Sequence, residues 1–196
     1  MGYILAKTCS VVLKVKINLP LIFLLSILPD IDLLIPFLNH RGPVHSIVVI
    51  TIVFLPFFVY YRKQVVPSYV ALAQHGLVGD YIAGGGVQLL WPLTVRFYGL
   101  NLSMVSQASI SIELISFVLA ILVLYITKDM AVLLKPKKEN FALLLPEGAI
   151  LGSVFLFWNQ AFSVELLFSH ILLFAVFAVS ILVSLENIVF SRFLRW

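Results

Sequence analysis

The chain has 196 residues, of which 62% are hydrophobic and 11% are charged, and its mean hydropathy is +1.10. A soluble domain is roughly half apolar and a quarter charged, so this composition excludes an ordinary water-soluble globule and predicts an integral membrane protein. The single cysteine, Cys9, excludes an internal disulfide framework, and the net charge of +4, spread over short segments, favours anionic membrane lipids over nucleic acid as partners.

Six apolar stretches are candidates for transmembrane helices, each of which needs about 20 apolar residues. In chain order they are Asn18–Leu38, Pro43–Tyr61, Pro67–Ala83, Gln107–Thr127, Phe141–Gln160 and Ser163–Phe190. We therefore expect an all-α fold, a polytopic transmembrane helical bundle of about six spans. One transmembrane domain is expected over residues 1–196, with a motif-bearing half at 19–106 and C-terminal helices at 107–196.

Prolines and glycines modify this pattern. Pro43 and Pro67 stand where a helix can begin, since the first turn has no use for a proline N–H. Pro29 and Pro36 fall inside the first stretch, which we expect to be kinked or broken. The third stretch ends in Gly84-Gly85-Gly86 and is expected to be short or re-entrant.

The distribution of charge predicts an orientation. With the N-terminus in the cytoplasm, all lysines and arginines except Arg41 and Arg96 fall on the cytoplasmic side. The same topology places eight unusual polar residues toward the outer ends of their helices or in outer loops: Asp30, Asp32, His40, Arg41, His45, Asp80, Glu113 and Glu165. The sequence thus predicts a multi-pass protein of the cell membrane with one polar site near the outer face.

The first candidate site residues are Asp30 and Asp32. A bare charge inside a membrane helix costs about 2.5–3.5 kcal/mol on insertion scales, so both carboxylates need a partner. On a regular helix they would point to nearly opposite sides, but Pro29 favours an irregular turn that lets them converge. The functional interpretation is metal ligation or general-base work, and the alternative is a helix break with solvated acids.

The second candidate cluster is the segment His40-Arg41-Gly42-Pro43-Val44-His45-Ser46. His45 is expected in the first turn of a helix, where free N–H groups and the helix dipole favour an anion. Arg41 offers a planar fork suited to phosphate or carboxylate. Two histidines flanking an arginine, close to two buried acids, indicate a functional site.

The third cluster pairs His75 with Asp80. Their spacing of five residues places them about 140° apart on an ideal α-helix. Either a bulge or a helix end brings them together, or one of them is not a ligand; a hydrogen-bonded core histidine is the alternative for His75. Weaker candidates are Glu113 and Glu165, interpreted as solvated caps, and His170, interpreted as an interhelical hydrogen bond.

Four motifs follow one another in order: P-D-I-D at 29–32, H-R-G-x-x-H-S at 40–46, His75 with Asp80, and G-G-V-x-L-L-W-P at 85–92. Over Leu28–Pro92 this order resembles the YdjM-like family of predicted inner-membrane metal-dependent hydrolases, which is distantly similar to zinc-dependent phospholipase C and P1 nuclease. The resemblance implies a divalent metal, zinc with manganese or iron as alternatives, and a catalytic role for Asp32 and Arg41, the arginine as a phosphate contact. The implied metal ligands or their immediate supports are Asp30, Asp32, His40, His45, His75 and Asp80.

Two features depart from the family pattern. The family begins with a Thr-His pair, whereas this chain has Lys7-Thr8-Cys9 and no histidine before His40. The family's His-x-x-x-Asp spacing is one residue longer here, and the strictly matching position is Gly76. Both departures leave open a reduced site or lost catalysis.

The leading hypothesis is a membrane-embedded metal-dependent hydrolase acting on a phosphoester, either a lipid or its headgroup. One alternative is an ion- or proton-coupled transporter or channel, because intramembrane Asp and His also form relays. The other is a non-catalytic structural membrane protein whose polar residues fasten helices together. The expected partners are membrane lipids and a lipid or other phosphoester substrate, with no nucleic acid.

Overall fold

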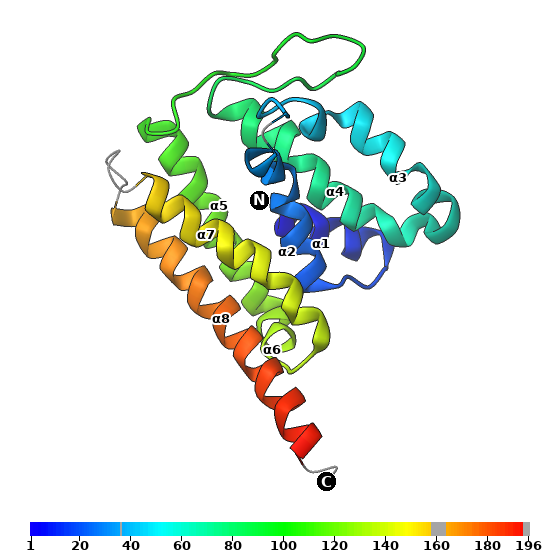
Figure 1. Cartoon of the computed structure of the whole chain (residues 1–196), viewed down its shortest axis with the longest axis vertical. Helices are drawn as coiled ribbons and strands as arrows, with labels where there is room; N and C mark the ends of the chain where they lie inside the picture. Colours follow the sequence, from blue (N-terminus) through cyan, green and yellow to red (C-terminus); the bar gives the residue numbers. More distant parts are fainter. Residues whose placement is uncertain (36, 158–163, 194–196) are drawn as a thin grey trace.

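The computed structural model describes residues 1–35, 37–157 and 164–193, and the regular elements of this part of the chain are helices (Figure 1). No side chains are described at 153–157, 164–165 and 190–193. The longer helices are α1 (Gly2–Leu13), α2 (Leu19–Ile27), α3 (Ile47–Tyr61), α4 (Val66–Gln74), α5 (Gln107–Ile126), α6 (Asp129–Leu133), α7 (Leu144–Phe157) and α8 (Val164–Phe193). Five shorter elements are η1 (Leu28–Leu34), η2 (Pro43–His45), η3 (Arg62–Val65), η4 (His75–Asp80) and η5 (Lys138–Leu143).

Local sequence explains where several helices begin and end. The side-chain oxygens of Asn18, Ser46 and Ser106 accept hydrogen bonds from free backbone N–H groups in the first turns of α2, α3 and α5. Helix α1 ends at Lys14 and α3 at Arg62, both of which have a positive φ that a continuing helix does not allow.

The first predicted span is broken, as expected. Helix α2 ends at Ile27, and the chain continues as the 3₁₀-helix η1 with Pro29 in its first turn. Pro67 lies in the first turn of α4, as predicted. The start predicted at Pro43 is wrong, because Pro43 opens the short 3₁₀ turn η2, and the extended Ser46 then caps α3. The expected kink at Pro36 and the predicted span ends at Gln160 and Ser163 lie outside the described residues.

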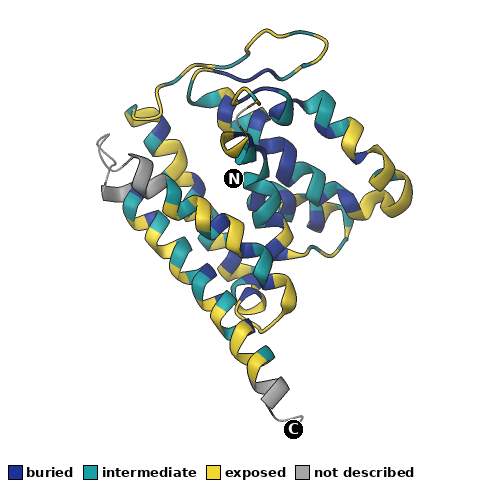
Figure 2. Cartoon of the chain, viewed as in Figure 1, coloured by how far each residue is buried: buried dark blue, intermediate teal, exposed yellow. Residues whose placement is uncertain are grey.

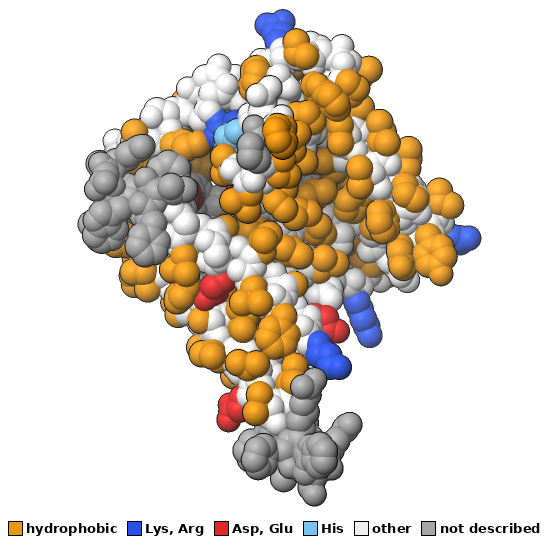
Figure 3. Space-filling model, in the orientation of Figure 1, with side chains coloured by type: hydrophobic (Ala, Val, Ile, Leu, Met, Phe, Trp, Pro, Cys, Tyr) orange, Lys and Arg blue, Asp and Glu red, His pale blue; other side chains and the backbone are white. Residues whose placement is uncertain are grey.

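Within the described residues, three helical stretches are long and apolar enough to cross a membrane: Ile47–Asp80, Gln107–Ile126 and Leu166–Val189. The first stretch turns back on itself near Arg62, so α3 and α4 form an antiparallel pair (Figure 1). Hydrophobic side chains cover much of the face shown in Figure 3. The all-α fold and the membrane location are confirmed. The count of about six spans is not, because the other predicted spans form shorter helices.

Buried side chains concentrate where α1, α2 and α4 meet (Figure 2). The C-terminal helices also contribute to this core, which contains Tyr3, Ala6, Leu19, Ile22, Ala71, Leu124, Leu133, Leu143 and Phe177. A smaller cluster, with Ile50, Phe54 and Leu72, joins α3 to α4. Between η1 and η4 on one side and α5, α7 and α8 on the other lies a cavity of about 890 Å³.

A buried ion pair fastens α1 to the corner between α5 and α6. Lys7 Nζ lies 2.5 Å from Asp129 Oδ2, and the hydroxyl of Tyr3 donates a hydrogen bond to the same oxygen at 2.9 Å. The hydroxyl of Thr8, the next residue after Lys7, bonds to the Ile4 carbonyl of its own helix. The side chains of Tyr3 and Lys7 therefore serve helix packing.

Candidate metal centre

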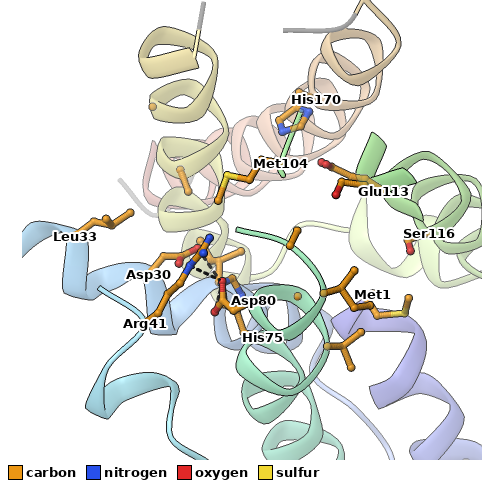
Figure 4. Close-up of a pocket in the computed structure, with 18 of the residues that line it drawn as sticks. Met1, Asp30, Leu33, Arg41, His75, Asp80, Met104, Glu113, Ser116 and His170 are labelled. Carbon is orange, nitrogen blue, oxygen red and sulfur yellow. Dashed lines mark ion pairs between the residues drawn. The ribbon is translucent and has the colours of Figure 1, made fainter. Parts of the chain in front are cut away.

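Four side chains that are distant in sequence converge at one end of the cavity; we call them the Asp–His cluster, and they are Asp30, His45, His75 and Asp80. Nε2 of His45 lies 3.5 Å from Asp30 Oδ1 and 3.2 Å from Asp80 Oδ2. Nε2 of His75 lies 3.1 Å from Asp30 Oδ2 and 4.0 Å from Asp80 Oδ2. Figure 4 shows Asp30, His75 and Asp80 gathered beside Arg41 on one side of the cavity.

The separations among His45, His75 and Asp80 fit ligands of a single ion, since these three residues each offer one donor atom within 4.8 Å of the others. Zinc binds imidazole nitrogen and carboxylate oxygen at about 2.0–2.2 Å, so two ligand atoms of one tetrahedral ion lie roughly 3.4 Å apart. His45 Nε2 and Asp80 Oδ2 are both buried and have no hydrogen-bond partner in the described structure. Leaving such buried polar atoms unsatisfied costs about 1–3 kcal/mol each, and a shared cation would satisfy both.

Both histidines have an oxygen atom behind the ring. Nδ1 of His75 lies 2.7 Å from the backbone carbonyl of Ser26 in α2, so the ring proton is assigned to Nδ1 and the lone pair to Nε2. Nδ1 of His45 lies 3.2 Å from Asp32 Oδ2, an electrostatic contact that does not meet hydrogen-bond geometry in the described structure. Metal-bound histidines typically have a carbonyl or carboxylate oxygen at the second ring nitrogen. The sequence could not identify Ser26 as the partner of His75, because the partner atom is a backbone carbonyl oxygen, which every residue has.

Asp32 lies behind His45, away from the cavity. It is 2% exposed, accepts the backbone N–H of Arg41 at 3.1 Å and lies 3.0 Å from Nδ1 of His40. The two carboxylates of η1 thus reach the same histidine, as expected, but at opposite ring nitrogens. Residues two apart on a 3₁₀-helix with three residues per turn point in different directions. Asp30, Asp32, His40 and His45 also each offer one donor atom within 4.8 Å of the others.

A π-helix explains how His75 and Asp80 share a face. Residues His75–Asp80 form η4, in which hydrogen bonding runs from residue i to i+5. A five-residue spacing on a π-helix therefore brings the two side chains toward the same face, as a four-residue spacing does on an α-helix. Gly76, the strictly matching position, is packed against His45, where an added Cβ would lie 2.5 Å from the backbone carbonyl oxygen.

Arg41 lies between the Asp–His cluster and the cavity. Its Nε is 3.1 Å from Asp80 Oδ1, its side chain is buried, and it lines the cavity. The guanidinium lies against Gly84, where an added Cβ would clash with both terminal nitrogens and where φ is +88°. The first of the three glycines that were expected to end a short span, Gly84, thus makes room for the arginine.

Hydrogen bonds join two of the sequence motifs into one unit. The backbone N–H of Gln88 donates to the Arg41 carbonyl at 2.9 Å. The hydroxyl of Ser46 lies 3.0 Å from the Leu89 carbonyl and 2.6 Å from the Trp91 carbonyl. Segments 40–46 and 85–92 are therefore adjacent, which explains why both motifs accompany the cluster.

Several expectations need correction. His45 lies in η2, before α3, and both of its ring nitrogens face carboxylates, so the anion site expected there is wrong. Glu113 is not a cap, because Ser106 caps α5 and Glu113 lines the cavity (Figure 4). His170 lines the same cavity, and its Nδ1 bonds to the Leu166 carbonyl of its own helix at 2.8 Å; the interhelical bond expected for it stays a prediction. The side chain of Glu165 lies outside the described ones.

One family of known proteins matches a part of the chain that includes all four sequence motifs. The model of a family described as YdjM inner membrane protein matches residues 1–161, which include the Asp–His cluster and Arg41. No curated protein and no solved structure matches the chain.

Proposed function

Since the chain belongs to the YdjM inner membrane protein family, we propose that it holds a divalent metal ion in its Asp–His cluster and hydrolyses a phosphoester. The observation that carries this proposal is the approach of two buried atoms, His45 Nε2 and Asp80 Oδ2, to 3.2 Å, although neither has a hydrogen-bond partner in the described structure. Asp30 and His75 bring two further donors to the same place.

The charge of the site supports a dication. Asp30, Asp32 and Asp80 carry three negative charges, and Arg41 carries one positive charge, which leaves a net charge of minus two when the histidines are neutral. Uncompensated charge is costly in a protein interior or a membrane. One divalent cation would balance this charge.

The residues divide into ligands and supports. We assign Asp30, His45, His75 and Asp80 as ligands, because their donor atoms face one another at the cavity end. Asp32 supports His45, and the more exposed His40 lies against Asp32. Mixed imidazole and carboxylate donors suit zinc, with manganese or iron as alternatives.

The chemistry follows from these positions. A bound divalent ion polarises a phosphoryl oxygen and lowers the pKa of a water molecule. Hydrolysis joins the water oxygen to phosphorus and breaks the bond from phosphorus to the alcohol oxygen, which leaves with a proton. Arg41, held in place by Asp80 and Gly84, would bind the phosphoryl oxygens, and such fixed donors stabilise developing negative charge.

Metal analysis of the detergent-purified protein tests the proposal. The wild-type protein and a control variant at an exposed acid, Glu139→Gln, should carry stoichiometric zinc or manganese, whereas His45→Ala and Asp80→Ala should lose it. The wild-type protein and Glu139→Gln should also hydrolyse p-nitrophenyl phosphate or bis(p-nitrophenyl) phosphate, whereas the two variants that lose the metal should not. A wild-type protein that stays metal-free after incubation with either ion would favour the structural alternative.

A further inference from the structure

The cavity beside the Asp–His cluster has a polar end and a long apolar wall. Asp30, Arg41, His75 and Asp80 lie at one end, and Glu113 and His170 lie across from them (Figure 4). Most of the remaining wall consists of aliphatic residues and glycines from η1, η4, α5 and α7. A volume of about 890 Å³ is at the upper end of the range for small-molecule sites.

Three glycines in this wall face open space. No atom lies within 4 Å of a Cβ added at Gly79, Gly148 or Gly152. Gly148 and Gly152 are four residues apart on α7 and therefore share one helix face. A glycine inside a helix makes that helix less stable than an alanine would. Since no neighbouring atom would prevent a side chain at either position, packing within the described structure does not explain the two glycines.

A buried polar group also points to a ligand in this cavity. The side chain of Arg41 is about nine-tenths buried and lines the cavity, and its Nε is ion-paired with Asp80 Oδ1 at 3.1 Å. A guanidinium in this position suits a phosphate group. The polar end of the cavity therefore matches a phosphorylated headgroup.

The mouth of the cavity is apolar as well. Leu34 and Val105 both line the cavity and are 76% and 61% exposed. Leu33 and Met104, their neighbours in sequence, share this placement. Figure 3 shows a hollow on this face, surrounded by hydrophobic side chains. Such a rim fits the hydrocarbon of a bilayer better than water.

We propose that the cavity is the acyl-chain site for a phosphorylated membrane lipid, which enters from the bilayer between η1 and residues 104–105. The phosphate lies against Arg41 and the Asp–His cluster, and the chain lies along Gly148 and Gly152 on α7. This inference rests on the proposed function, since it names the substrate class of the same site.

The test uses full-length protein in phosphatidylcholine nanodiscs and a phosphatidic acid with a diazirine near the end of its acyl chain. The double variant Gly148→Leu/Gly152→Leu fills the wall where no atom clashes and leaves the cluster untouched. The control is Ala175→Leu, which also introduces a leucine side chain, but at an exposed position of α8 that does not line the cavity. Excluding two or three methylene groups corresponds to about a tenfold loss of affinity.

We expect cross-links on α5 and α7 in the wild type and the control, and about tenfold fewer in the double variant. Unlabelled phosphatidic acid should compete, and glycerol 3-phosphate at the same concentration should not. Metal content should be unchanged in the double variant, because the proposed ligands all lie in the cluster and none lies on α7.

Equal labelling of the double variant, or labelling confined to the outer face of α3, would overturn the acyl-chain site and leave the metal centre standing. Competition by glycerol 3-phosphate alone would also overturn it, since the headgroup would then be the whole ligand. Cavity labelling in a protein that holds no metal would support the lipid site and refute the hydrolase.

Discussion

Nδ1 of His45 lies 3.2 Å from Oδ2 of Asp32, a carboxylate that is itself 2% exposed. The opposite nitrogen of the same ring faces Asp80 and Asp30. One imidazole thus connects a buried acid to the wall of the cavity. This relationship distinguishes a supporting carboxylate from ligand carboxylates, although the three are chemically identical.

Asp32→Asn should weaken metal binding without abolishing it. Replacement of a residue that orients a metal-bound histidine typically costs about 10–100-fold in affinity, because the ring loses its preferred orientation. Asp80→Asn removes a ligand and should reduce affinity much further. Competition with a chromogenic chelator would measure both constants. Equal losses in the two variants would contradict the division into ligand and support.

Gly84→Ala should impair phosphate binding more than metal binding. An added Cβ would clash with the guanidinium of Arg41, which must then leave its place beside Asp80. We expect about a tenfold weaker inhibition by inorganic phosphate, equivalent to the loss of one charge-assisted contact. Gly148→Ala, which meets no atom, is the matched control. Unchanged phosphate inhibition in Gly84→Ala would show that Arg41 is not the phosphate contact.

The π-helix at His75–Asp80 should tolerate a deletion better than an insertion. Removing the exposed Leu77 converts the five-residue spacing to four, which an α-helix places on one face. Adding one alanine after Leu77 leaves neither helix type able to align the pair. Metal content should therefore survive the deletion and be lost on insertion. Loss in both variants would mean that the π geometry itself is required.

Asp129→Ala should destabilise the fold without direct effect on the site. Removing one partner of a buried ion pair costs about 3–5 kcal/mol, because Lys7 is left charged and unpaired, and Tyr3 also loses its acceptor. The double variant Lys7→Met/Asp129→Leu should recover much of this loss. Thermal denaturation in detergent, followed by circular dichroism, would compare them. A double variant no more stable than Asp129→Ala would argue against the pairing.

The proposed orientation places His40 outside and Lys137 in the cytoplasm, since lysine and arginine favour the cytoplasmic side. In a Cys9→Ser background, single cysteines at these two positions should react oppositely with a membrane-impermeant maleimide applied to intact cells. The cysteine at 40 should be labelled before lysis and that at 137 only afterwards. Labelling at 137 in intact cells would invert the topology.

Local properties of the sequence were sufficient for the class of protein. Apolar stretches, proline positions and the order of four motifs predicted a helical membrane protein, a break before Pro29 and a family, and these predictions are confirmed. Each depends on composition or on neighbours within a few residues, which the chain itself displays. The six candidate ligands, Asp32 among them, and the candidate phosphate contact Arg41 could be named from the same motifs, but the separate roles of the ligands could not.

The proposed division of those residues into metal ligands and supporting residues depends on the tertiary structure. The acceptor for His75 is the Ser26 carbonyl on another helix, and the wall opposite the cluster belongs to α5 and α7, far along the chain. The π-helix that joins His75 to Asp80 departs from the ordinary period, so helical spacing alone left their meeting undecided. Burial and hydrogen-bond direction arise only when distant segments pack, and they are the basis on which we propose Asp32 as a support and Asp80 as a ligand.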